Sequence, residues 1–301
     1  MEKVKDSENT AATRVSTRHA PRVLMPRAPQ AQAVLLLVVF VTAWAGQQTI
    51  QPPREFKEYP GYEYNNFPVP EDYLDKHEWT RARLKYPSFL NVHGYAADGY
   101  NRWTVDYPRS DRHLLAGVRR LTRIDTKSVE QVVDLDGEDD VYNWPVMYAV
   151  EVGYWNLPDD QIAQLREYLL RGGFFMCDDF HGTIEWENFM RVMKKVFPER
   201  RVVDLDNKDP IFHVLYDLDE RFQVPGMQYV VYPPHHMYEY DGFVARWEGI
   251  YDDKGRVMVA ICHNMDLGDA WENSDDPTYP ERFADLAYRI AMNYFIYDLS
   301  H

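Results

Sequence analysis

The sequence predicts an α/β domain built on a mostly parallel, doubly wound sheet flanked by helices, with a β-rich insertion or extension in its C-terminal half. Three observations support this. Strand and helix patterns alternate along the middle of the chain. The run at 174–177 is wholly apolar, as in strands covered by helices on both faces. Polar residues follow that run directly, at the strand end where open parallel sheets bind ligands.

The first 45 residues are predicted to be a leader and signal peptide. An apolar segment at 33–45 follows several arginines and ends in the small-x-small triplet Ala43-Trp44-Ala45, which indicates cleavage before Gly46. The segment is shorter than the about 20 residues that a transmembrane helix needs. We therefore expect an exported protein, periplasmic or extracellular. An uncleaved membrane anchor is the alternative, and it would be the protein's route to a membrane.

Residues 46–87 are predicted to form an extended arm. Its prolines and tyrosines recur at spacings that suit neither a helix nor a strand ladder. The aromatic residues favour an arm that lies on the domain, and a free linker is the alternative. The α/β domain is then expected over 88–301.

The first half of that domain alternates strands with helices. Apolar runs predict the strands, and apolar residues at helical spacing, such as Leu114, Leu115 and Val118, predict the helices. Acidic residues near Pro158 mark the start of one helix, and Gly172-Gly173 marks its end. The expected strands are 88–95, 129–135, 146–152 and 174–177, and the expected helices are 111–124, 158–171 and 184–197.

The second half has more strand patterns and closes with a helix. The turn Asp252-Asp253-Lys254-Gly255 predicts a hairpin between the last two strands. An amphipathic pattern predicts a final helix over 281–299. The expected strands are 201–205, 212–218, 228–232, 243–251 and 257–262.

Composition excludes some classes of function. The formal net charge is −15 and becomes more negative without the basic leader, so nucleic acid is not an expected partner. The two cysteines, Cys177 and Cys262, exclude a disulfide framework. Each ends a predicted strand, and they are expected to be two buried small hydrophobes, with a single bridge as the alternative.

Three groups of polar residues are expected to meet at the carboxyl edge of the sheet and to form a ligand site. They follow the strands at 146–152, 174–177 and 257–262. The groups consist of Glu151 with Tyr154 and Trp155, of Asp178, Asp179 and His181, and of His263, Asn264, Asp266, Asp269, Trp271 and Glu272.

Neighbouring carboxylates separate one another's pKa values, as acid/base chemistry requires, and they could also hold a divalent cation. However, the sequence contains no compact metal motif, so no metal ligands are assigned and the cofactor is unknown. Single aspartates could instead cap helices or stabilise loops. Arginines could compensate the charge or bind an anionic ligand, and tryptophans suggest a stacking surface of the kind that sugars use. The residues concerned are Arg102, Arg109, Arg112, Arg246, Trp155, Trp186, Trp247 and Trp271.

The run GGFFMCDDF at 172–180 and the run NMDLGDAWE at 264–272, in this order, resemble the bacterial family called domain of unknown function 4159. The resemblance covers about residues 86–301. It implies a fold like that of the class I glutamine amidotransferase superfamily, with a flavodoxin-like sheet. Amidotransferases of that superfamily carry a nucleophilic cysteine on the sharp turn after a central strand, whereas here the turn carries Asp178 and Asp179. Two departures from the family pattern are His181, where tryptophan is frequent, and Ala270, where glycine is frequent.

Cys177 lies one step before that turn, inside the strand, without a base beside it, so we expect no cysteine nucleophile. The sequence thus predicts a domain that binds a ligand or a partner, such as an envelope protein or a carbohydrate. The alternative is a carboxylate-based or metal-assisted hydrolase acting on a carbohydrate or cell-envelope substrate, with Asp178, Asp179 and His263 at its centre.

Overall fold

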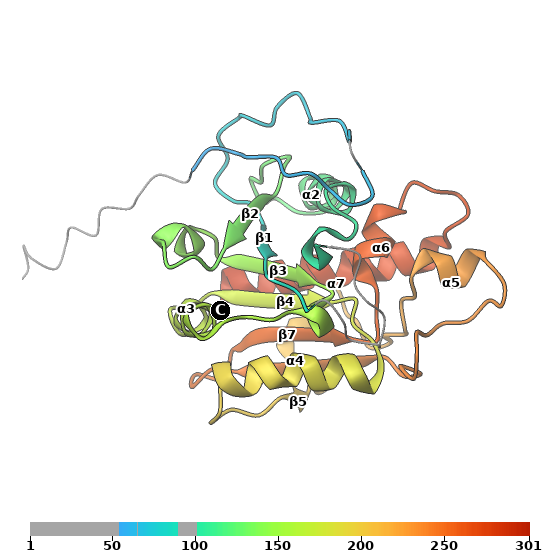
Figure 1. Cartoon of the computed structure of the whole chain (residues 1–301). Coiled ribbons are helices and arrows are strands. Elements are labelled where there is room, and N and C mark those ends of the chain that lie inside the picture. The colour runs from blue at the N-terminus through green and yellow to red at the C-terminus, as the bar shows by residue number, and fades with distance from the viewer. Residues whose placement is uncertain (1–53, 65, 90–100) are drawn as a thin grey trace, which may run out of the picture. The chain divides into compact units, whose positions relative to one another are not determined.

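A computed structural model describes residues 54–64, 66–89 and 101–301 (Figure 1). The predicted leader and apolar segment at 1–45, the first residues of the predicted arm, and residues 90–95 of the first predicted strand lie outside the described residues. Among the described helices, none is long and apolar enough to span a membrane.

The sheet has seven strands in the order β2-β1-β3-β4-β7-β6-β5. The five from β2 to β7 in this order are parallel, whereas β6 runs antiparallel to β7, and β5 antiparallel to β6. This confirms the predicted mostly parallel α/β sheet, and the order of the parallel strands is that of flavodoxin-like folds. The strands are β1 (Ala82–Lys85), β2 (Gln131–Asp134), β3 (Val146–Val150), β4 (Phe174–Asp178), β5 (Val203–Asp204), β6 (Arg246–Tyr251) and β7 (Val257–His263).

Helices cover both faces of the sheet, with α3 and α4 on one face and α2, α6 and α7 on the other (Figure 1). The α-helices are α2 (Arg109–Leu121), α3 (Asp159–Leu170), α4 (Gly182–Val196), α5 (Met227–Val231), α6 (Leu267–Glu272) and α7 (Glu281–Ser300). The 3₁₀ turns are η1 (Arg102–Thr104), η2 (Asp139–Asn143), η3 (Val152–Tyr154) and η4 (Pro210–Phe212).

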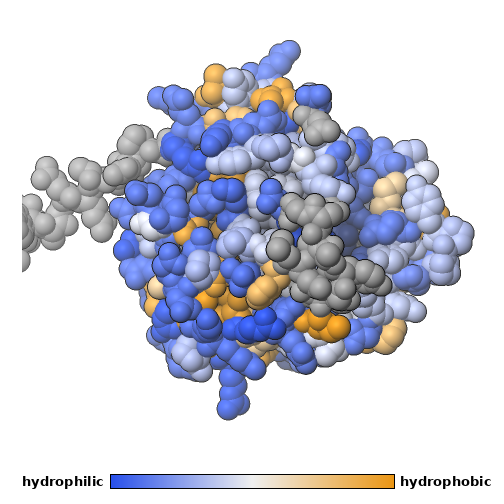
Figure 2. All heavy atoms as spheres, in the orientation of Figure 1, coloured by the Kyte–Doolittle hydropathy of each residue, from blue (hydrophilic) through white to orange (hydrophobic). Residues whose placement is uncertain are grey.

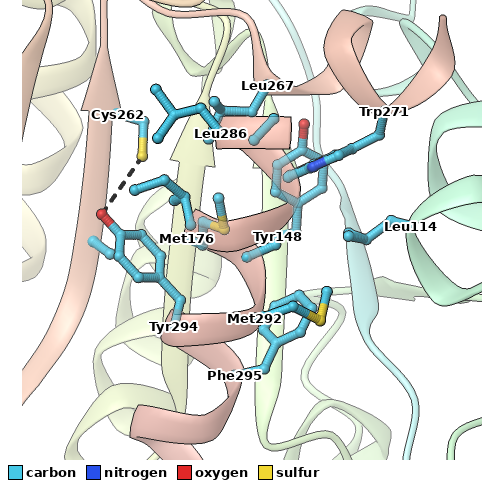
Figure 3. Close-up of a cluster of buried hydrophobic side chains, with 14 of the residues drawn as sticks. Leu114, Tyr148, Met176, Cys262, Leu267, Trp271, Leu286, Met292, Tyr294 and Phe295 are labelled. Carbon is cyan, nitrogen blue, oxygen red and sulfur yellow. Dashed lines mark hydrogen bonds between the residues drawn. The ribbon is translucent and has the colours of Figure 1, made fainter. Parts of the chain in front are cut away.

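The two hydrophobic cores follow from the alternation of side chains along the strands. In β3, Tyr148 and its alternate neighbours pack toward α2 and α7, while Met147 and Ala149 pack toward α3 and α4. Figure 3 shows the first of these cores, in which Leu114, Tyr148 and Trp271 lie together with residues of α7. Because both faces are covered, β3 and β4 are buried at every position, which explains their continuous apolar sequences.

Several elements differ from the sequence prediction. The first strand is β1, upstream of the predicted strand at 88–95, where Ser88 forms only an isolated bridge with Trp155. The predicted strand at 212–218 is wrong, because η4 ends there and turns follow it. The predicted strand at 228–232 is the one-turn helix α5. Short α6 was not predicted. The hairpin at 252–255 and the helices α2, α3, α4 and α7 are confirmed within a few residues.

Both cysteines are buried and free, as expected for small core residues. Cys177 packs among the α3 and α4 core, whereas Cys262 lies on the opposite face, with its sulfur 3.9 Å from the Tyr294 hydroxyl (Figure 3). Burial raises the pKa of both thiols well above the usual value. A protonated thiol inside the core is a poor nucleophile.

The described part of the N-terminal segment contacts the domain through aromatic rings and backbone carbonyls. Tyr59 packs edge-on against Trp103, and Phe67 packs against His113. The Arg112 guanidinium donates to the carbonyl of Phe67 at 3.0 Å and to that of Pro68 at 2.8 Å. On the face drawn in Figure 2, hydrophilic residues dominate and hydrophobic ones are scattered, in keeping with the acidic composition.

Candidate functional site

The loop after β4 places Asp178, Asp179 and His181 at the carboxyl edge of the sheet. Asp178 is the last strand residue and is fully buried; its Oδ2 accepts hydrogen bonds from the backbone N–H groups of Leu267 at 2.6 Å and Gly268 at 3.1 Å. It therefore binds the start of α6, not that of the helix that follows it. The Asp179 carboxylate does not bind the start of α6 and instead contacts the His181 ring.

Backbone strain concentrates at this edge. The non-glycine residues with positive φ in the described chain are Asp106, Glu151, Asp179, Tyr240 and Asn264, with φ between 49° and 64°. All but Tyr240 follow strands β1, β3, β4 or β7, and Tyr240 belongs to the segment between β5 and β6. Such conformations cost about 1–3 kcal/mol each and persist where the surrounding structure enforces them, often at functional sites.

Backbone hydrogen bonds tie three of these loops together. The Glu151 N–H donates to the Asp178 carbonyl at 3.2 Å, the Asp179 N–H to the Met265 carbonyl at 2.8 Å, and the Asn264 N–H to the Phe180 carbonyl at 3.0 Å. The loops after β3, β4 and β7 thus form one connected surface, because the carboxyl ends of parallel strands lie at the same edge of the sheet.

Three buried carboxylates converge there. Asp106, Asp179 and Asp266 each offer an oxygen, and these oxygens all lie within 4.8 Å of one another. The three residues are between 3% and 7% exposed. Burial raises the pKa of each well above the usual range, and the charges of neighbouring carboxylates raise it further. At neutral pH such an arrangement requires either bound protons or a cation.

A second group shares Asp179 and adds an imidazole. The His181 Nε2 lies 3.1 Å from the Asp179 Oδ1 and 3.8 Å from a Glu239 oxygen, and one ligand atom from each of the three lies within 4.8 Å of the others. Burial lowers the pKa of His181 to about 3, so its ring is neutral at pH 7. A neutral imidazole beside carboxylates is a common donor set for divalent transition metals.

Two atoms within these groups are buried yet lack a hydrogen-bond partner among the described residues. They are Asp106 Oδ2 and His181 Nδ1, and each residue is 3% exposed. A buried polar atom without a partner costs free energy, so its presence in a site calls for a ligand. The α6 backbone packs closely on the first of them, since a Cβ on Gly268 would come within 2.1 Å of Asp106 Oδ2.

Further acidic side chains lie next to these groups. Glu63 accepts the Asp106 N–H at 3.2 Å and forms a third carboxylate group with Asp106 and Glu272. Burial and the charge of Asp269 raise the pKa of Glu272 to about 9. Burial likewise raises the pKa of Glu239 to about 8.

The arginines compensate only part of this charge. Arg102 pairs with Glu151 at 3.0 Å, although burial and the charge of Glu185 still raise the pKa of Glu151 to about 8. The other three arginines proposed from the sequence bind other carboxylates: Arg109 binds Asp275, Arg112 binds Glu58, and Arg246 binds Asp204 and Glu248.

The predicted site residues therefore divide. Asp179, His181 and Asp266 meet in the acidic groups, with Glu151 and Glu272 beside them. Trp155 and Trp271 are fully buried and stack in the core, on Phe175 and Phe189 and against Tyr148, so they present no ring to a ligand. The remaining predicted residues hold the loops in place through hydrogen bonds: Asp178, Asp269, His263 and Asn264.

Sequence reasoning missed Asp106 and Glu239. Asp106 follows β1 in the chain order, and placing the start of that strand six residues too late hid its position. Glu239 lies in the irregular segment between β5 and β6, where no periodic pattern points to it.

Fold and site together define a flavodoxin-like α/β domain with an acidic carboxyl edge. The model of the family described as "Domain of unknown function (DUF4159)" matches residues 82–299, and the chain belongs to this family. The match begins at the first residue of β1 and ends within α7, so it covers the entire sheet. None of the curated proteins matches the chain.

Proposed function

We propose that this domain is a ligand- or partner-binding domain that holds a divalent cation at the carboxyl edge of its sheet, without a cysteine nucleophile. The observation that carries the proposal is the convergence of Asp106, Asp179 and Asp266, whose buried oxygens lie within 4.8 Å of one another. Carboxylate oxygens are the ligands that Mg²⁺, Ca²⁺ and Mn²⁺ prefer. The unpartnered Asp106 Oδ2 supports the same interpretation.

The cation would also account for the charge balance. Bound protons alone could neutralise the three aspartates, but they would be lost as the pH rises, and the protein would lose stability with them. A divalent cation replaces those protons and fixes the three loops relative to one another. An oxygen-rich ligand or an acidic side chain of a partner could then complete its coordination.

Calorimetric titration of the full chain with MnCl₂, after dialysis against EDTA, tests the proposal. We expect saturable binding near one equivalent and a higher melting temperature, because a ligand that binds only the folded state stabilises it. Absence of binding to Mn²⁺, Mg²⁺ and Ca²⁺ would refute the cation site.

One observation favours the hydrolase alternative. Burial raises the pKa of Glu239 to about 8, and this carboxyl group lies 3.8 Å from His181, so in the cation-free site it is protonated at pH 7 and able to act as a general acid. Cation-dependent turnover of a glycoside or ester substrate that falls in Glu239→Gln would favour an enzyme over a binding role.

We also propose that the protein acts outside the cytoplasm, on the strength of the apolar segment at 33–45 and its small-x-small end. Amino-terminal sequencing of the exported protein should begin at Gly46. A chain that keeps residues 1–45 and stays in the cytoplasm would contradict export.

A further inference from the structure

A pocket of about 300 Å³ lies beside the acidic groups, at the start of α4 and the adjoining ends of β6 and β7. Its lining includes Trp186, Phe243, Arg246, Glu248 and His263. None of these residues belongs to the acidic groups of the cation site. The two sites are nevertheless neighbours, because Gly182 follows His181 and donates its N–H to the Asn264 side chain at 2.8 Å.

One wall of this pocket is a platform of stacked rings. The His263 ring stacks on Trp186 with centroids 4.7 Å apart and on Phe180 with centroids 4.9 Å apart, at angles of 26° and 24°. Phe243 stands at the rim, 62% exposed, and is held edge-on by Tyr238. An exposed phenylalanine and a half-buried tryptophan lining one cavity offer flat apolar surface to a ligand.

The polar part of the pocket holds two hydrogen-bond acceptors, on Glu248 and His263, beside the Arg246 guanidinium, which pairs with the other oxygen of Glu248 at 3.2 Å. Glu248 is 5% exposed, and its Oε2 has no hydrogen-bond partner among the described residues. This oxygen faces the His263 Nδ1 at 3.9 Å, too far for a direct hydrogen bond. The His263 Nε2 lies 3.3 Å from the Gly182 carbonyl, which can only accept, so Nε2 carries the proton and Nδ1 is a bare acceptor. Burial lowers the pKa of His263 to about 4, which keeps the ring neutral.

These features select the chemistry of the ligand. Two acceptors side by side require a ligand that donates hydrogen bonds from neighbouring groups. A purely apolar ring would bury Glu248 Oε2 without a partner, an anion would face Glu248 and Asp241, and an amine would face Arg246. A neutral ring with hydroxyl groups and an apolar face satisfies all of these conditions.

We propose that this pocket binds a pyranose ring of a carbohydrate, with the C–H face of the sugar on Trp186 and Phe243 and two of its hydroxyl groups donating to Glu248 and His263. The inference goes beyond the cation site and stands on other residues. Binding of the sugar does not require the cation.

Saturation-transfer NMR of the full chain with chitotriose, cellotriose and maltotriose tests this inference. We expect at least one of the three to bind with a Kd of about 1 mM, and Phe243→Ala and Glu248→Gln each to weaken that binding about tenfold. Phe243→Ala is a mild change to the fold because the ring is mostly exposed, and Glu248→Gln keeps the shape of the side chain.

Two control variants lie away from the pocket. Tyr142→Ala removes a ring from η2, which follows the opposite edge strand β2, and Glu199→Gln removes a carboxylate that pairs with Arg166. Both should leave sugar binding unchanged, and binding should persist in EDTA.

Three results would overturn the inference. In the first, none of the trisaccharides gives saturation transfer at about 10 mM. In the second, a trisaccharide binds the Phe243 and Glu248 variants as tightly as the wild type. In the third, binding disappears in EDTA but not in Phe243→Ala, which would place the sugar at the acidic groups and leave the cation proposal standing.

Discussion

Replacing Asp179 with asparagine should abolish the stabilisation of this protein by Mn²⁺. Asp179 belongs to both the Asp106/Asp179/Asp266 group and the group with His181 and Glu239, so its loss removes a ligand from each. In the wild type, Mn²⁺ at 100 times its Kd should raise the melting temperature by about 5–10 °C, and in Asp179→Asn the rise should vanish. Differential scanning calorimetry with and without EDTA measures this.

The same variant should be more stable than the wild type when no cation is present. Burial and neighbouring charges raise the pKa of Asp179, so its ionised form opposes folding at neutral pH, and the neutral amide removes this cost. Asparagine also tolerates the positive φ of 51° at this position. Asp159→Asn, a change to a side chain that is 88% exposed, is the control and should alter neither quantity. A variant that keeps the full response to Mn²⁺ would refute the assignment of Asp179 as a ligand.

Replacing Asp111 with asparagine should cause the largest loss of stability that the fold predicts. Asp111 lies in α2 and binds two arginines of the β1 region, Arg81 through Oδ1 and Arg83 through Oδ2, the latter at 2.6 Å. All three side chains are fully buried. Removing the carboxylate leaves two buried guanidinium groups without their counterion, and the free energy of unfolding should fall by about 3–5 kcal/mol.

Urea denaturation of the purified variant measures this loss. Asp275→Asn is the matched control. Asp275 is likewise an aspartate paired with an arginine, here Arg109 of α2, but its side chain is 62% exposed, so its loss should cost less than about 1 kcal/mol. Equal effects of the two substitutions would show that the buried network does not hold β1 against α2.

The ion pairs of Asp111 with Arg81 and Arg83 also explain why the first strand could not be recognised from the sequence. The run Arg81-Ala-Arg-Leu-Lys85 contains three basic residues and lacks the apolar pattern of a central strand. It lies between β2 and β3 nevertheless, because Asp111 and the carbonyls of Trp103 and Val105 satisfy the buried guanidinium groups. A tertiary ion pair of this kind leaves no local signature.

Elements whose sequences carry a strong periodic pattern were predicted with nearly correct bounds. In β3, β4, α3, α4 and α7, apolar residues recur at the period of the element, and glycine or proline marks their ends. Apart from the first strand, the wrong strand predictions fall between β5 and β6. The β-branched run at 228–232 forms a single helical turn there, since Gly226 and the bond from the Met227 N–H to Asp269 fix its start.

The candidate site was predictable where it depended on strand ends and not where it depended on irregular segments. Asp178, Asp179 and Asp266 follow two strands whose sequences are unambiguous. Asp106 could not be assigned to the site without the correct position of β1. Glu239 lies in the segment between β5 and β6, and only tertiary contacts bring that segment to the site. For the tryptophans, the sequence could not distinguish a ring in the core, such as Trp155, from a ring that lines a pocket, such as Trp186.

Anomalous diffraction from crystals grown with MnCl₂ tests the cation site most directly. We predict a manganese peak among the carboxylates of Asp106, Asp179 and Asp266, with oxygens about 2.0–2.6 Å from the ion. Crystals saturated with Mn²⁺ in which these three carboxylates share no anomalous peak, while the ion is found elsewhere or not at all, would contradict the account.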